Sequence, residues 1–212
     1  MNVRLEYSYM FTAGVWLKDA PPVMNSFSLT LNLVTASTDI IEQNIAFDRM
    51  NYFINEVISN SFFINEEEVE TINHLQSAGI RAISLPESPY EQVVGLLLYR
   101  KLNAIMEGRI FVTDLKISST YGQNVLYLYS GEEVDDIFDS SGWWEDPDPS
   151  WKDRQPPTRK NKIVELSNVS STTWRDVGLQ WEDEPASAED KEKAGVERPT
   201  VGVVMKFNQD PE

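Results

Sequence analysis

The stretch RLEYSYMF at residues 4–11 indicates the fold class, because its apolar side chains recur at every second position. Its apolar face consists of Leu5, Tyr7, Tyr9 and Phe11. A period of two is typical of a strand that buries one face. The stretch FSLTLNL at residues 27–33 repeats the alternation after a break at Pro21-Pro22. The sequence therefore begins with two predicted antiparallel strands.

A helical period follows the second strand. The apolar residues that recur at helical spacing are Phe47, Met50, Ile54, Val57 and Ile58. A second helical piece is predicted within residues 63–79, closed by Gly79, and residues 80–85 are predicted as a short strand or an extended loop. In ESPYEQVVGLLLYRKL, residues 87–102, Ser88 is the predicted N-cap, Pro89 the first helical residue and Glu91 the partner in a capping box.

Two further strand-like runs, residues 109–117 and 124–130, flank a turn that contains Gly122. The predicted class is α+β, with two strands, two or three helical pieces and two further strands in chain order. The composition then changes near residue 131. Residues 1–131 carry a net charge of −6, whereas residues 132–212 carry −10 and hold five of the six Trp and seven of the eleven Pro. We expect a core over 1–131 and an irregular acidic extension over 132–212.

Charge and composition exclude several functions. The net charge of −16 disfavours direct binding to nucleic acid, whose affinity depends on Lys and Arg at phosphates. The chain has no Cys, so thiolate chemistry and Cys-ligated metals are excluded. It shows no apolar run of about 20 residues, which a membrane-spanning helix needs. We expect a soluble, cytoplasmic protein that does not bind membranes.

Several stretches resemble the tunnelling-fold family of 6-pyruvoyl- and 6-carboxytetrahydropterin synthases. They are Phe11-Thr12-Ala13-Gly14-Val15, Val23-Met24-Asn25-Ser26-Phe27, Ala46-Phe47-Asp48-Arg49-Met50, Asn60-Ser61-Phe62-Phe63-Ile64-Asn65 and Glu87-Ser88-Pro89-Tyr90-Glu91-Gln92. They occur in the order found in the family and lie within residues 3–131. The resemblance implies the tunnelling fold, in which an antiparallel four-stranded sheet carries two main helices on one face. It also implies a ring-like homo-oligomer.

The positions that carry the family's chemistry hold other residues in this chain. The three zinc-binding histidines of the family match Val15, Val23 and Asn25, and the stretch that carries its proton-relay histidine, residues 60–65, contains no His. The glutamate that anchors the pterin falls at Ile117 or Ser118. We therefore expect no catalytic residue, metal site or cofactor, and interpret the chain as a catalytically degenerate relative.

Other catalytic patterns are weak. His74, the one histidine, lies in a polar stretch, and we interpret it as a partly exposed helix residue. Three carboxylates, Asp48, Glu87 and Asp114, remain candidates for a relocated site in a pterin- or purine-nucleotide-binding enzyme. A third alternative is an acidic inhibitor that mimics the charge of nucleic acid.

The extension supplies the candidate partner-binding residues. They are Trp143, Trp144, Trp151, Asp146, Asp148, Trp174 and Trp181. Aromatic anchors beside carboxylates suit docking onto a basic protein surface. The same indoles could instead fold back onto their own domain or onto a sister subunit, because Trp is rarely left exposed. The leading hypothesis is a non-catalytic homo-oligomeric interaction protein with an acidic Trp-rich arm. A fast-diverging genome, such as a viral one, would suit this loss of chemistry with retained packing.

Overall fold

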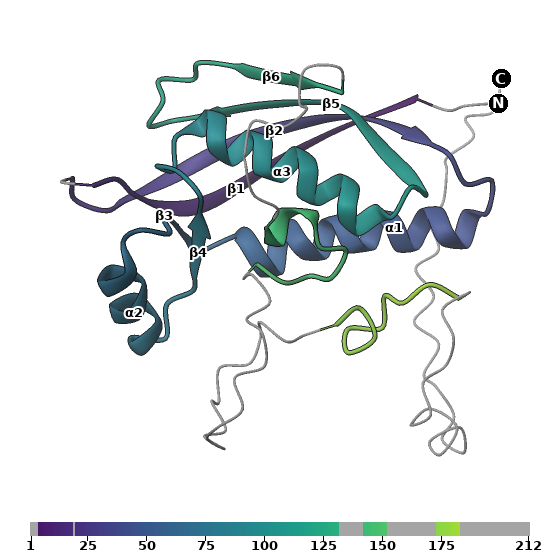
Figure 1. Ribbon diagram of the computed structural model, residues 1–212. Helices are drawn as coiled ribbons and strands as arrows, with labels where there is room; N and C mark the ends of the chain where they lie inside the picture. The colour runs from purple at the N-terminus through teal and green to yellow at the C-terminus, as the bar shows by residue number, and fades with distance from the viewer. Residues whose placement is uncertain (1–3, 19, 132–141, 152–172, 183–212) are drawn as a thin grey trace, which may run out of the picture. The chain divides into compact units, whose positions relative to one another are not determined.

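The computed structural model describes residues 4–18, 20–131, 142–151 and 173–182. Their strands are β1 (Arg4–Trp16), β2 (Val23–Thr35), β3 (Phe62–Asn65), β4 (Ala82–Leu85), β5 (Ile110–Ser119) and β6 (Tyr127–Ser130). The helices are α1 (Ile40–Tyr52), a π-helical continuation η1 (Phe53–Ile58), α2 (Val69–Ser77) and α3 (Glu91–Met106), and the 3-10 turn η2 is Trp143–Glu145. Figure 1 shows their arrangement.

The strands form one sheet in the order β4-β3-β1-β2-β5-β6. The predicted antiparallel part is present as β1, β2, β5 and β6, with Tyr7 opposite Leu31 and Leu29 opposite Ile117. The prediction of only four strands is wrong, because β3 and β4 add a parallel pair beside the end of β1. The sheet therefore contains both parallel and antiparallel strands, and β3 pairs with β1 only at Gly14–Trp16.

Gly14 permits this addition. A Cβ at Gly14 would lie 2.3 Å from the ring of Phe62, so the missing side chain leaves room for this ring of β3 against β1. Residues 62–65 are a strand and not the start of the predicted second helix, because Phe63 and Ile64 are fully buried in the sheet. The helical piece begins at Val69 instead and ends before Gly79, which has φ +74°.

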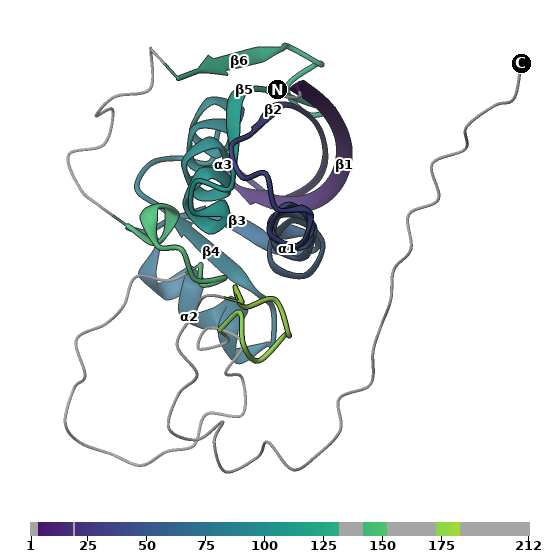
Figure 2. The same ribbon diagram turned by 90° about the vertical axis from the view of Figure 1, so that its right-hand side faces the viewer.

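The helices α1 and α3 cover one face of the curved sheet (Figures 1 and 2). Between them and the sheet lies the main core, which includes Phe27, Leu31, Met50, Phe53, Leu97, Leu102, Ile105 and Leu115. The alternation in β1 and β2 places apolar side chains such as Phe27 and Leu31 toward the helices and leaves the other face of the sheet to solvent. The predicted placement of two main helices on one face is confirmed.

The predicted capping box is absent from α3. The helix begins at Glu91, and its N-cap Tyr90 makes no side-chain cap bond. The carboxylate of Glu91 instead accepts a hydrogen bond from Ser119 Oγ at the end of β5. Tertiary contact with the sheet thus replaces the local cap that the sequence pattern predicts.

The chain divides into two compact units, residues 1–181 and 182–212. The described parts of the extension, residues 142–151 and 173–181, belong to the first unit and contact its helices. The sequence also predicts short extended segments in NKIVELSNVS, residues 161–170, and in RPTVGVVMKF, residues 198–207, and both lie outside the described residues. Among the residues that are described, none of the helices has both the length and the apolar character that crossing a bilayer requires.

Candidate functional site

The three positions that match metal ligands lie together at one end of the β1–β2 pair. Val15 is opposite Val23, and Asn25 lies two residues along β2, where it is opposite Ala13. Side chains two apart on a strand share a face, and directly opposite Cβ atoms are about 5 Å apart. The sequence matches therefore select three neighbouring side chains on the helix-covered face.

The residues at these positions do not fit zinc. A catalytic zinc site needs three His, Cys or carboxylate ligands, and valine has no donor atom. Asn25 is 2% exposed, and its Oδ1 accepts a hydrogen bond from the Tyr121 backbone N–H at 2.9 Å, which ties the β5–β6 turn to β2. Of the two positions that match the pterin-anchoring glutamate, Ile117 is fully buried in the core. This end of the sheet has a packing role in place of a metal site.

Restoring the ligands tests this placement. The variant V15H/V23H/N25H is expected to bind about one Zn²⁺ per chain, because three imidazoles would then converge on one face and leave one coordination position open. The measurement is metal content after dialysis, with a titration against a chromophoric chelator. V15H/V23H alone is the matched control and should bind the ion far more weakly. Equal binding by the double and triple variants would contradict the predicted role of position 25.

The alternative carboxylates do not converge. Asp48 lies on α1, Glu87 in the loop before α3, and Asp114 on β5, where its Oδ2 accepts hydrogen bonds from Asn32 Nδ2 and Thr113 Oγ1. Within the described ranges, no group of three His, Asp or Glu side chains could hold a metal ion. His74 is exposed on α2, which agrees with its interpretation as a surface residue.

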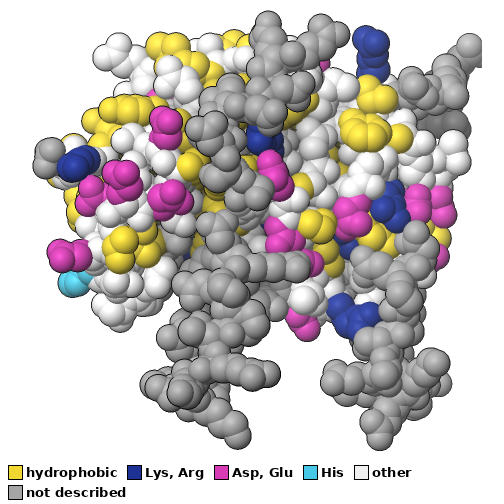
Figure 3. Space-filling model, in the orientation of Figure 1, with side chains coloured by type: hydrophobic (Ala, Val, Ile, Leu, Met, Phe, Trp, Pro, Cys, Tyr) yellow, Lys and Arg dark blue, Asp and Glu magenta, His cyan; other side chains and the backbone are white. Residues whose placement is uncertain are grey.

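Acidic side chains gather over the α2 end of the face in Figure 3. The sequence before and within α2 supplies Glu66, Glu67, Glu68 and Glu70. Glu66, Glu67 and Glu70 are exposed. We interpret this run as a solvated helix start, where carboxylates interact favourably with the helix dipole.

All five Trp of the extension are buried, each at 2–4% exposure. Trp143 and Trp144 pack edge to face, and Trp143 Nε1 donates to the Ser84 carbonyl of β4 at 2.9 Å. The structure thus places these indoles against their own domain, which was the second of the two outcomes considered for them. Their predicted binding to a separate partner stays a prediction.

A buried lysine of α3 fastens the first part of the extension. Lys101 is fully buried, and its ammonium donates hydrogen bonds to the carbonyls of Trp143, Asp146 and Asp148 at 2.7–2.8 Å. The backbone of residues 143–148 therefore surrounds the cation. The Asp146 carboxylate accepts from the Asp148 backbone N–H at 3.0 Å and shapes the same loop.

A buried arginine of α1 fastens the second part. Arg49 is fully buried, and its Nε donates to the Leu179 carbonyl at 2.7 Å. The guanidinium carbon of Arg49 lies 4.8 Å from the ring centroid of Trp174 and 3.9 Å from that of Trp181. Arg109 lies 4.4 Å from the Trp181 centroid. Such contacts are cation–π interactions, which strengthen when water is excluded.

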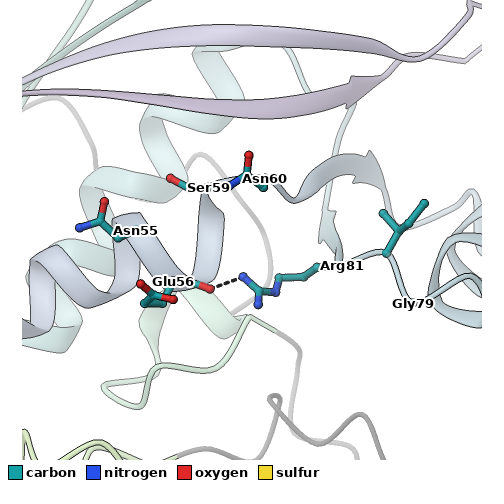
Figure 4. A pocket seen from close by; sticks show the side chains of 7 residues that line it. Asn55, Glu56, Ser59, Asn60, Gly79 and Arg81 are labelled. Atoms are coloured by element: carbon teal, nitrogen blue, oxygen red, sulfur yellow. Dashed lines mark hydrogen bonds between the residues drawn. The ribbon is translucent and has the colours of Figure 1, made fainter.

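Arg81 is a further cation of the core that contacts the extension. It borders a polar pocket of about 400 Å³, lined also by Asn55, Glu56, Ser59 and Asn60 (Figure 4). Its guanidinium donates to the carbonyls of Glu56 and Val57 at the end of η1, where a cation suits the helix dipole. It also lies 5.1 Å from the Trp151 centroid. Arg81 therefore has a structural role in the pocket wall, because it holds the end of η1 and contacts the extension.

The sequence interpretation identified the indoles but missed their cationic partners Arg49, Lys101 and Arg81. A signal for one of them was present, because Lys101 falls on the apolar stripe of α3 between Leu98 and Leu102. A charge within a core-facing stripe needs a buried partner. No sequence pattern assigns that partner to carbonyls 42 to 47 residues away.

The fold and this site define a mixed α+β protein whose tryptophan-rich extension is bound to buried cations of its own core. No protein-family model and no curated protein matches the chain. Among solved structures it is similar to an uncharacterized protein from Wolinella succinogenes, at 11% identity and a TM-score of 0.44, over 62% of this chain and 99% of that one.

It is also similar to two 6-pyruvoyl tetrahydropterin synthases. The Caenorhabditis elegans protein is 11% identical with a TM-score of 0.39, over 62% of this chain and 96% of that one. The Plasmodium vivax protein is 9% identical with a TM-score of 0.39, over 61% and 97%. Both belong to the family that the stretches around Val15 and Val23 resemble.

Proposed function

We propose that this chain is a non-catalytic, self-associating interaction protein on a pterin-synthase-like core. The absence of catalysis is supported by the donor chemistry at the ligand positions, where Val15 and Val23 cannot coordinate a metal. The buried Asn25 amide accepts a structural hydrogen bond there. The observation that carries the assembly role is the pair of open edges of the antiparallel strands.

The two edges are complementary in direction. Among the described residues, no strand pairs with Arg4–Phe11 of β1 on the side away from β2, and none pairs with β6 on the side away from β5. Because four antiparallel strands alternate in direction, β1 and β6 run oppositely. A rotation about an axis along the strands brings β6 of one copy beside β1 of the next in antiparallel orientation. Such a head-to-tail contact closes into a ring when the rotation between neighbouring copies divides a full turn without a shift along the axis.

The solvent face beside these edges has an interface-like composition. It exposes large apolar side chains at Met10, Met24, Phe111 and Leu128, with exposed fractions of 47–74%. Its charged residues are balanced, with Arg4 and Lys116 against Glu6 and Asp114, in a chain of net charge −16. Two copies of an acidic chain repel each other, and this repulsion is weaker where the facing surfaces have balanced charges.

The variant L128E tests the assembly role. Leu128 lies on β6 opposite Lys116, so a carboxylate there has a cation within the monomer and the fold should be kept. At an interface the same charge would be desolvated, so the wild type is expected to be an oligomer and L128E a monomer in light scattering after size exclusion.

The matched control for L128E is I40E. Ile40 is 70% exposed at the start of α1, away from the sheet face. I40E should keep the oligomer of the wild type. A monomeric wild type, or loss of the oligomer in both variants, would contradict the proposed edge contact.

A second candidate function, binding of a pterin or purine nucleotide, is favoured by one observation. Asn25 is buried, and its Nδ2 has no hydrogen-bond partner among the described residues. Thermal-shift measurements with pterins, GTP and divalent ions separate the two functions. The assembly role predicts no shift of the melting temperature, whereas a rise of several degrees that N25A abolishes would favour ligand binding.

A further inference from the structure

We propose that the Arg49 region is a binding site for a tryptophan-bearing peptide, and that residues 173–182 of a second copy can occupy it in exchange for the chain's own segment. The observed contact within one chain defines the ligand: two indoles seven residues apart, with a backbone carbonyl between them for Arg49 Nε. The inference extends the interaction role proposed for the extension.

The receptor side is built without the segment. Arg49 Nη1 donates to Glu107 Oε1 at 2.6 Å and to the Ile105 carbonyl at 3.3 Å, and both partners lie at the end of α3. These bonds orient the guanidinium before any indole arrives. Glu107 also accepts from Trp181 Nε1 at 2.8 Å, so the receptor offers an aromatic-stacking cation and a hydrogen-bond acceptor for the same indole.

The ligand side has the properties of a short linear motif. Within 173–182 the described structure is a set of turns, closed by the bond from Leu179 N–H to the Trp174 carbonyl at 2.8 Å. Trp174 and Trp181 are its two buried side chains, and Val177 and Leu179 are partly buried against the core. A few aromatic anchors in pockets commonly carry most of the energy of such a contact.

The turn is organised by Asp176. Its Oδ2 accepts from the Thr173 backbone N–H at 2.8 Å and from Thr173 Oγ1 at 2.9 Å. These two bonds hold the pKa of Asp176 below its ordinary value. Because the folded pKa is the lower one, this contribution is present above the ordinary pKa of the carboxyl and is lost as the pH falls through the lowered pKa.

The chain length permits exchange between copies. Residues 152–172 connect the two anchored parts, and 21 residues can span at most about 70 Å. That reach exceeds the roughly 30 Å diameter of a small domain. Exchange of an identical element between copies requires no new contact, since each site receives the same ligand.

The experiment uses a fluorescent peptide of residues 172–182 and the full chain carrying W174A/W181A, read by fluorescence polarisation. The peptide is expected to bind this variant at least about tenfold more tightly than the wild type. The reason is that the resident segment of the wild type competes at a millimolar effective concentration. A peptide with both Trp replaced by Ala should bind neither chain. If circular dichroism shows the double variant to be unfolded, W181A alone replaces it.

The second arm tests exchange itself, in the L128E background so that sheet association does not contribute. L128E chains with an intact segment, mixed at about millimolar concentration with L128E/W174A/W181A chains, are expected to form a one-to-one complex that the latter chains do not form among themselves, because exchange must compete with the effective concentration of the resident segment. Equal peptide affinity for variant and wild type, or no binding to a folded variant, overturns the site. Peptide binding without the one-to-one complex overturns exchange. Neither result bears on the edge contact, which L128E tests separately.

Discussion

Replacing Lys101 by methionine is expected to lower the free energy of unfolding by about 3 kcal/mol or more. The methionine fills a similar volume but cannot donate, so the carbonyls of Trp143, Asp146 and Asp148 lose their shared cation. Each buried acceptor left without a donor costs about 1–3 kcal/mol, and the desolvation of the ammonium that is avoided offsets part of the total. Urea unfolding followed by tryptophan fluorescence measures the change.

K116M is the matched control for K101M. Lys116 lies on β5 on the solvent face of the sheet and is half-buried, so its replacement should change the stability by less than about 1 kcal/mol. Equal destabilisation by K116M and K101M would show that loss of a lysine, and not loss of the buried carbonyl cluster, causes the effect. Unchanged stability in K101M would mean that residues 143–148 can leave the core without cost.

The antiparallel part of the fold could be predicted because its signals are local. The alternation at residues 4–11 and 27–33 specifies which face is buried, and the observed register places Tyr7 opposite Leu31 accordingly. A strand at residues 80–85 is one of two predicted outcomes and is present as β4, but β3 and the parallel pairing of both strands could not be predicted in the same way. Each has four residues, which is too short for a clear alternation, and β3 packs the ring of Phe62 against Gly14 of β1, a contact across 48 residues of sequence.

The candidate site shows the same difference between features with local sequence signals and features that depend on long-range contacts. The resemblance selected Val15, Val23 and Asn25 from separate stretches, and the structure brings them to one end of β1 and β2. The role of the indoles depends on contacts over long sequence separations, such as the 130 residues between Arg49 and Leu179. An acidic, Trp-rich extension could dock on a basic surface of another protein or on the cations of its own core. Its composition is the same in both cases, so composition alone does not separate these two roles.

Replacing Arg49 by leucine is expected to destabilise the protein by about 3–5 kcal/mol. Arg49 is fully buried, so its removal leaves the Leu179 and Ile105 carbonyls without their buried donor. Glu107 loses one partner but keeps its contacts with Arg109 and Trp181 Nε1. The two indoles also lose the cation between them. Hydrogen exchange measured by mass spectrometry should rise most in residues 173–182, because these residues then lose their principal anchor.

R109L is the matched control for R49L, since Arg109 stacks on the same indole from a more exposed position, with 20% of its side chain accessible. Its loss should cost about 1 kcal/mol or less, as expected for an exposed cation–π contact.

In K101M, hydrogen exchange should instead rise most in residues 142–151. The two anchors are thus separable in principle, with one coupling: Trp174 Nε1 donates to the Pro147 carbonyl at 2.6 Å. If R49L and K101M each raise hydrogen exchange equally in residues 142–151 and 173–182, the Trp174–Pro147 hydrogen bond makes the two parts of the extension one cooperative unit. Residues 173–182 could then pass to a second copy only together with residues 142–151.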